Sequence, residues 1–189
     1  MRRLALAPVP PDPDLRALVR ARLGDLGLAL RVLAEDVTGL DASIDAVTVD
    51  LRGTVVLVLI GTAGRDLELL AHALAQRAWV REHMGDWLKL APALGIESDA
   101  PVRLLLLAPA FGPRSLAAAR AVDPEGIDLA VYRCVRNGAE TDVLLEPVRL
   151  SGGDVAGHED PTDVTAVPFR TGLTDADLGL SAAERRLFD

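Results

Sequence analysis

The chain has 189 residues, half of them hydrophobic, with 3% aromatic residues and a net charge of −8. This composition excludes a disordered chain, and the length predicts a single domain whose core is packed mainly by Leu, Val and Ala. The acidic charge disfavours nucleic-acid binding, which depends on cations that neutralise phosphates.

Residues 1–11 are predicted to be a flexible, proline-bearing lead. They contain no long apolar segment ahead of a cleavage site, so we expect no signal peptide and a cytoplasmic protein. The sequence Asp12-Pro13-Asp14 is typical of a helix start, with Asp12 as the N-cap and proline in the first turn. Apolar residues then recur at helical spacing, and the helix is expected to end near Gly24.

Arginines give the first 31 residues a basic bias. A solvated basic helix face is the commoner explanation for such a pattern. The alternative is nucleic-acid binding without cleavage, in which Arg16, Arg20 and Arg22 of this helix would contact phosphates. The arginines of the whole basic stretch are Arg2, Arg3, Arg16, Arg20, Arg22 and Arg31.

The segment Leu28–Val37 is ambiguous between helix and strand, and we favour a strand because a hairpin follows it. That hairpin is predicted over Ile44–Gly61, with its turn at Asp50–Gly53. Its first half alternates apolar and polar residues, which is typical of a strand with one covered face. Its second half is an unbroken apolar run, which suits a strand buried on both faces.

The segment Arg65–Met84 is predicted to be the longest helix, with Gly85 as its C-cap and a short helical piece over Trp87–Ala93. Three aromatic side chains at intervals of four should lie on one side of it: Trp79, His83 and Trp87. The packing face is predicted to follow Leu67, Leu70, Leu74, Ala78 and Arg81.

A third, wholly apolar strand is predicted over Val102–Ala108, followed by a short helix over Ser115–Val122. Strands over Ile127–Arg136 and Asp142–Pro147 should flank a turn at Asn137-Gly138. The one cysteine, Cys134, is predicted to be a buried structural thiol rather than a nucleophile. Neither apolar strand is long enough for a bilayer, which needs about 20 apolar residues.

Residues 151–189 change in composition, so we divide the chain into a core, 1–150, and a terminal part, 151–189. The terminal part begins with an acidic linker rich in Gly and Pro and ends in a helical tail with two capping-box patterns. We expect the tail to pack on the core or on a second copy, and a homodimer is the expected assembly. The apolar tail residues are Phe169, Leu173, Leu178, Leu180, Leu187 and Phe188.

The element order predicts an α/β fold with a mixed central sheet of about five strands flanked by helices. With Ile44-Asp45 on the first hairpin strand, it resembles the restriction-endonuclease-like fold of the PD-(D/E)xK nuclease superfamily. The run Val55–Gly61 falls where that family carries its Glu-x-Lys triplet. The segments Gly64–Asp66 and Ala75–Val80, the latter with Gln76, resemble its following helix. The similarity covers about residues 14–147.

The chain departs from this family at the triplet, where it has Leu59-Ile60-Gly61. Mg²⁺ is usually held by carboxylates, and the family's lysine stabilises charge on the phosphate. Leucine and glycine supply neither group. We therefore predict a catalytically inactive, nuclease-like domain that serves as a structural or protein-interaction module and has no cofactor. Its vestigial pocket would contain Asp45, Leu59, Gly61 and Gln76.

The alternative is a metal-dependent DNA nuclease with a rearranged site, in which Asp66 or Glu68 joins Asp45 to hold Mg²⁺ or Mn²⁺. The interpretation without a functional site places Asp45 on the solvent side of a half-covered strand and Gln76 on an exposed helix face. It takes Asp66 and Glu68 as first-turn acids favoured by the helix dipole.

The histidines give weaker indications. His72 and His83 lie eleven residues apart, about three helical turns, so they cannot share a metal. His158 lies beside two acids in the linker and is a weak metal candidate.

Overall fold

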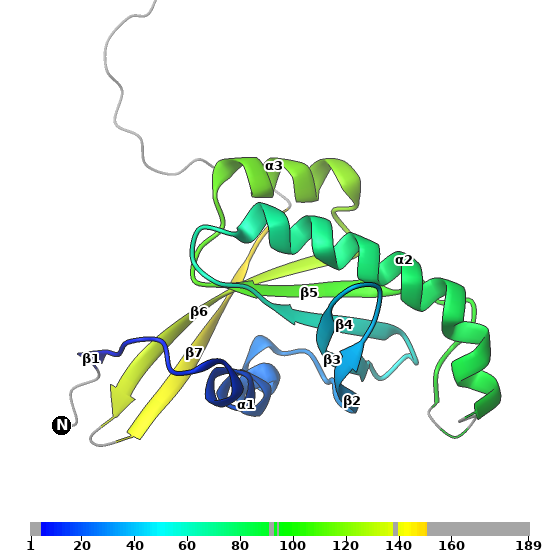
Figure 1. Cartoon of the computed structure of the whole chain (residues 1–189), viewed down its shortest axis with the longest axis horizontal. Helices are drawn as coiled ribbons and strands as arrows, with labels where there is room; N and C mark the ends of the chain where they lie inside the picture. The colour runs from blue at the N-terminus through cyan, green and yellow to red at the C-terminus, as the bar shows by residue number, and fades with distance from the viewer. Residues whose placement is uncertain (1–4, 91–92, 94, 138–139, 151–189) are drawn as a thin grey trace, which may run out of the picture. The chain divides into compact units, whose positions relative to one another are not determined.

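The computed structural model describes residues 5–90, 93, 95–137 and 140–150. Within them, seven strands form one mixed sheet in the order β1-β6-β5-β4-β3-β2, and β7 pairs with the outer side of β6. Helices lie against the sheet (Figure 1), which confirms the predicted α/β class. The predicted linker and helical tail over 151–189, including His158, lie outside the described residues.

The central strands are β4 (Val55–Ile60), β5 (Arg103–Ala108) and β6 (Ile127–Asn137), which run parallel to one another. Their crossover helices are α2 (Asp66–Leu90) and α3 (Pro113–Val122). Parallel neighbours require such crossovers, whereas hairpins join antiparallel ones. The antiparallel pairs here are β2 (Arg31–Thr38) with β3 (Ser43–Val49), β3 with β4, and β6 with β7 (Glu140–Val148).

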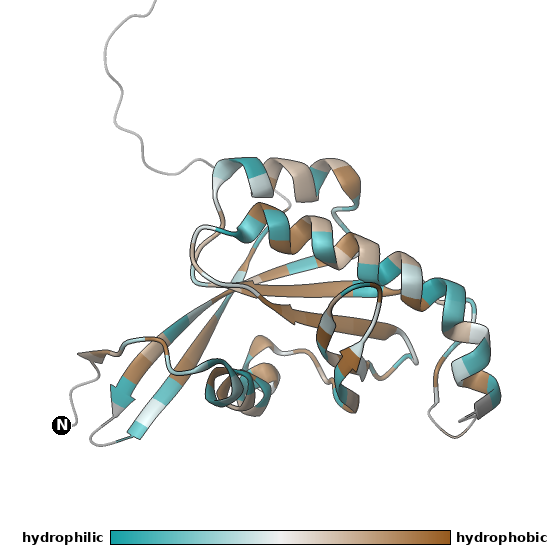
Figure 2. Ribbon diagram, in the orientation of Figure 1, coloured by the Kyte–Doolittle hydropathy of each residue, from teal (hydrophilic) through white to brown (hydrophobic). Residues whose placement is uncertain are grey.

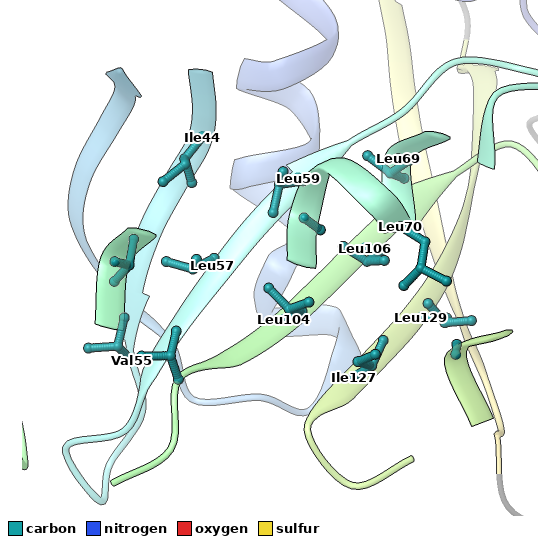
Figure 3. Packing of buried hydrophobic residues seen from close by; sticks show 14 of the residues in the cluster. Ile44, Val55, Leu57, Leu59, Leu69, Leu70, Leu104, Leu106, Ile127 and Leu129 are labelled. Carbon is teal, nitrogen blue, oxygen red and sulfur yellow. The ribbon is translucent and has the colours of Figure 1, made fainter. Parts of the chain in front are cut away.

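The central sheet has a hydrophobic cluster on each face. On β4, Leu57 and Leu59 belong to the cluster under α2 and α3, and Val56 and Val58 belong to the cluster over α1 (Asp12–Arg22). Side chains of a strand alternate between faces, so a continuous apolar run is what this position requires. Figure 2 shows the apolar strands, and Figure 3 shows leucines of the first cluster on the strands beside Leu69 and Leu70 of α2.

The first hairpin strand, β3, was predicted to have one covered face, and this is wrong. From Ile44 to Val49 every residue is buried, because α1 and the 3₁₀ turn Leu23–Leu26 cover one face while α2 covers the other. The polar residues of the alternation are therefore inside. The hydroxyl of Thr48 donates to the Val56 carbonyl at 2.8 Å, which satisfies it without water.

Helix α2 is longer than predicted. It runs without interruption to Leu90, with Gly85 inside it rather than at its end, so residues 87–90 belong to α2 and not to a separate helical piece. The predicted packing face is also displaced, because Leu67 is 47% exposed. The buried residues recur every three or four positions instead, at Leu69, Leu70, Ala73, Gln76, Val80 and Met84.

The lead is only in part irregular, since Ala5–Leu6 forms a short strand, β1, paired with Val135 and Arg136 of β6. Helix α1 begins at Asp12 with Pro11 as its N-cap, so the prediction of Asp12 as the cap is wrong by one residue.

Cys134 is 5% exposed, and burial raises the pKa of its thiol, in agreement with a structural role. In the described part of the chain, no helix combines the length and the apolar character needed to cross a membrane.

Candidate functional site

The cleft around the end of β4 is the natural candidate site, because Ile60 and Gly61 line it and the sequence resemblance would place the catalytic triplet there. It has a volume of about 520 Å³. Its walls come from α1, from the loop after β4 and from the first turns of α2. Lining residues with polar side chains are Asp12, Arg16, Thr62, Arg65, Glu68 and His72.

Asp45 lies inside the protein, so the interpretation that placed it on the solvent side of β3 is wrong. Its side chain is 8% exposed, and burial raises its pKa. One oxygen, Oδ2, accepts a hydrogen bond from the backbone N–H of Ile60 at 2.7 Å. The last pair in the β3–β4 ladder is Ala46 with Val58, so this carboxylate serves an amide just beyond the end of the ladder.

The other oxygen of Asp45 is neutralised by Arg16, whose Nε lies 2.8 Å from Oδ1. The same guanidinium reaches Asp36 at 2.7 Å and Asp12 at 2.9 Å. One cation therefore bridges three acids that come from α1, β2 and β3. Burial disfavours the charged form of Arg16, but the three carboxylates outweigh it and its pKa is raised.

The sequence did not predict this bridge: its pattern favoured a solvated basic helix face for Arg16, with phosphate binding as the alternative. The spacing of Asp12 and Arg16, four residues apart on one helix, was a local signal for their pairing. No comparable signal exists for Asp36 or Asp45, because both are brought to Arg16 by the sheet. Asp36 has a positive φ of 49°, which is uncommon for a residue other than glycine.

Apolar side chains pack around Leu59 and Gly61, where the sequence resemblance would place the triplet. Leu59 is 1% exposed and belongs to the core under α2. A side chain at position 61 would bring its Cβ to 2.8 Å from Cδ2 of Leu69, so Leu69 would have to shift to admit it. The Gly61 carbonyl is also held, since it accepts a hydrogen bond from the Tyr132 hydroxyl at 3.0 Å. Burial raises the pKa of Tyr132 to about 12, so it remains a donor at neutral pH.

The two acids considered as replacements are engaged elsewhere. Oδ2 of Asp66 accepts the Gly112 amide at 2.7 Å, and its carboxylate also bonds the hydroxyl of Ser115. These bonds lower the pKa of Asp66 and join the start of α2 to the start of α3. Glu68 lines the cleft but forms an ion pair with Arg65.

Gln76 is completely buried, so the interpretation that placed it on an exposed helix face is wrong. Its Oε1 accepts the Leu40 amide at 3.1 Å, and its Nε2 donates to the Leu40 carbonyl at 2.6 Å. A Cβ at Gly39 would lie 1.8 Å from Oε1, so glycine is required for this approach. Both polar ends of Gln76 thus hold the loop between β2 and β3, which is a structural role.

The remaining candidates do not converge on the cleft. His72 lines it, whereas His83 stacks on Trp79 further along α2, so the two histidines share no site. The arginines of α1 are also paired: Arg20 with Glu35 at 3.2 Å, and Arg22 with Asp25 and Asp142. They are not a free basic face.

The donor set does not fit the divalent metal that a nuclease of this type would use. Mg²⁺ needs oxygen ligands in an octahedron, and carboxylates normally supply at least one of them. Here the buried carboxylate of Asp45 already has a cation and an amide as partners. Across the described residues, no group of three or more His, Cys, Asp and Glu side chains is placed to hold a metal ion.

No known protein-family profile matches the sequence, and no curated protein matches it either. Solved structures with a similar arrangement include a repair endonuclease from Pyrococcus abyssi, with a TM-score of 0.45 and 14% identity over 66% of this chain and 48% of that one. An EndoMS–dsDNA2 complex has a TM-score of 0.39 and 14% identity over 59% and 43%. The chain spans about half the length of these proteins or less. At these TM-scores, neither structure informs the function of this chain.

Proposed function

We propose that the chain is a nuclease-like domain without nuclease chemistry, which acts as a structural or protein-interaction module. The observation that carries this proposal is the contact between Arg16 and Asp45. A guanidinium lies against the carboxylate that a metal-dependent nuclease would offer to its ion. Phosphodiester hydrolysis of that type needs a metal to activate water and to stabilise charge on the phosphate.

The apolar packing around the end of β4 supports the same proposal. Restoring a lysine at position 61 would require the side chain of Leu69 to shift. An acid at position 59 would be buried among leucines, where an unpaired charge is very costly. Recovery of the triplet therefore needs several coordinated changes rather than one.

The test is a cleavage assay with plasmid and single-stranded DNA in the presence of Mg²⁺ or Mn²⁺. We expect no cleavage above that of a matched Asp45→Ala protein. Robust cleavage by the native chain that disappears in Asp45→Ala would overturn the proposal. That result would favour the alternative, a nuclease in which Asp66 or Glu68 cooperates with Asp45.

Self-association as a homodimer is the second part of the proposal, because two-fold homo-oligomers are the commonest soluble assemblies. Light scattering coupled to size-exclusion chromatography measures the mass directly. A mass twice that of the 20.0 kDa chain is expected, and a single-chain mass at all concentrations would contradict it.

A further inference from the structure

A second cavity lies between the edge strand β2 and the later turns of α2, apart from the cleft around Arg16. Its volume is about 240 Å³. None of the described lining residues carries a charge: they are Leu33, Ala34, Val37, Val47, Trp79 and Trp87. Apolar pockets of this kind are where small ligands usually bind, because most of the binding free energy comes from removing apolar surface from water.

The aromatic walls are held in place by other contacts. Trp79 stacks on His83, with ring centroids 4.5 Å apart and planes 28° from parallel. His83 is itself fixed, because its Nδ1 lies 2.8 Å from the Trp79 carbonyl oxygen. Trp87 meets Trp79 edge to face at a centroid distance of 6.2 Å. A site whose walls are already ordered loses less entropy when a ligand enters.

The size and chemistry of the cavity define what it would take. An engineered apolar cavity of about 150 Å³ binds benzene, so this larger one accommodates two fused rings. The ligand should be neutral, since an ion would lose its hydration without gaining a partner from these walls. Two indoles favour an aromatic ligand, which can pack against them face to face or edge to face.

We propose that this pocket binds a small, neutral aromatic molecule of one or two fused rings. The site is independent of the proposed loss of nuclease chemistry, because it shares no residue with the cleft around Arg16. Either proposal can fail without affecting the other.

Both tryptophans of the chain line the pocket, so intrinsic fluorescence reports directly on its occupancy. The probe is 6-propionyl-2-(dimethylamino)naphthalene, a neutral dye with two fused rings that accepts energy from excited tryptophan. Titration should give saturable binding of one dye per chain, with tryptophan emission falling as dye emission rises. Indole should displace the dye.

The test variant is Ala34→Leu, which places three further carbons in the pocket from an exposed position on β2 and keeps both tryptophans. The matched control is Ala71→Leu, the same substitution at an exposed position of α2 outside the pocket. Ala34→Leu should weaken dye binding by at least about tenfold, which is about 1.4 kcal/mol. Ala71→Leu should bind as the native chain does.

If Ala34→Leu does not fold, as judged by near-ultraviolet circular dichroism, Trp87→Ala replaces it. That variant removes one wall and should show the same loss of affinity. The proposal is overturned if the native chain shows no saturable binding. It is equally overturned if the folded pocket variant binds the dye as tightly as Ala71→Leu.

Discussion

At the scale of single residues, the central finding is that one arginine side chain forms ion pairs with three acidic side chains. Arg16 contacts Asp12, Asp36 and Asp45, and only Asp45 is buried. Exposed ion pairs contribute little to stability, because water and salt screen them. The buried pair differs, since removing its cation leaves a charge inside the protein.

Substitution Arg16→Ala should therefore lower the free energy of unfolding by about 3 kcal/mol. The matched control is Arg20→Ala, whose partner Glu35 has a side chain 46% exposed, against 8% for Asp45, and which should cost about 1 kcal/mol or less. Urea unfolding monitored by circular dichroism measures both. Equal losses in the two variants would show that burial of Asp45 adds nothing to the pair.

The contact of Gln76 with the Leu40 backbone gives a second prediction. Gln76→Met keeps the side-chain length but leaves the Leu40 amide and carbonyl without their partner, at a cost of about 2 kcal/mol. Gly39→Ala should cost a similar amount, because its Cβ would displace Oε1 of Gln76. The double variant should lose much less than the sum in urea unfolding, since both changes break the same contact. Additive losses would contradict this assignment.

At the scale of elements, the sequence predicted the central parts of the fold and failed where long-range contacts decide. The apolar runs of β4 and β5 and the Asn137-Gly138 turn are local patterns, and the structure has strands where they were predicted. The burial of β3 could not be read from its alternation, because that depends on α1 covering the second face. Strand β1 was also unpredictable, since two residues gain their structure only from β6.

The end of α2 was misplaced because glycine is a common helix terminator. Gly85 instead lies within the helix, and a Cβ built there meets no atom within 4 Å. Gly85→Ala should therefore raise the free energy of unfolding by about 1 kcal/mol, because alanine restricts the unfolded chain and fits the helix. Thermal unfolding should show the gain as a higher Tm. A lower Tm would mean that the helix needs glycine for a reason other than space.

The junction between α2 and α3 should depend on pH. The Ser115 hydroxyl and the Gly112 amide lower the pKa of Asp66. A carboxyl whose pKa is lower in the folded state contributes stability above its unfolded pKa and loses it as the pH falls. Asp66→Ala should cost about 1 kcal/mol at pH 7. The difference from the native chain should begin to shrink below about pH 4, where this carboxyl takes up a proton in the unfolded chain while the folded chain still holds it ionised.

Unfolding of both proteins in urea across pH 3–7 checks this prediction, with Asp14→Ala as a control for an acid on a different helix and without these bonds. A difference between the native chain and Asp66→Ala that stays constant across the range would contradict it.

At the scale of the whole molecule, charge and its placement argue against binding to nucleic acids. The chain has 28 acidic and 20 basic residues, not counting histidine. The arginines of α1 that gave the N-terminal region its basic bias are paired with acids. Phosphate contacts would have to compete with these pairs, and the negative field of the chain would oppose the approach of DNA.

We therefore expect no gel shift with double-stranded or single-stranded DNA at physiological salt. At low salt any shift should be weak and unchanged when Arg16, Arg20 and Arg22 are neutralised together. A strong shift that weakens with salt and disappears in the triple variant would restore the interpretation of α1 as a nucleic-acid-binding helix.

The pairing of β1 has a practical consequence. The first half of β6 hydrogen-bonds to β5, but its second half has β1 on that side, and the Ala7 amide donates to the Cys134 carbonyl at 2.9 Å. An expression variant that starts at residue 11 would strip this cover and leave an open strand edge, which is a template for aggregation. Shortened variants of the chain should accordingly keep the first ten residues.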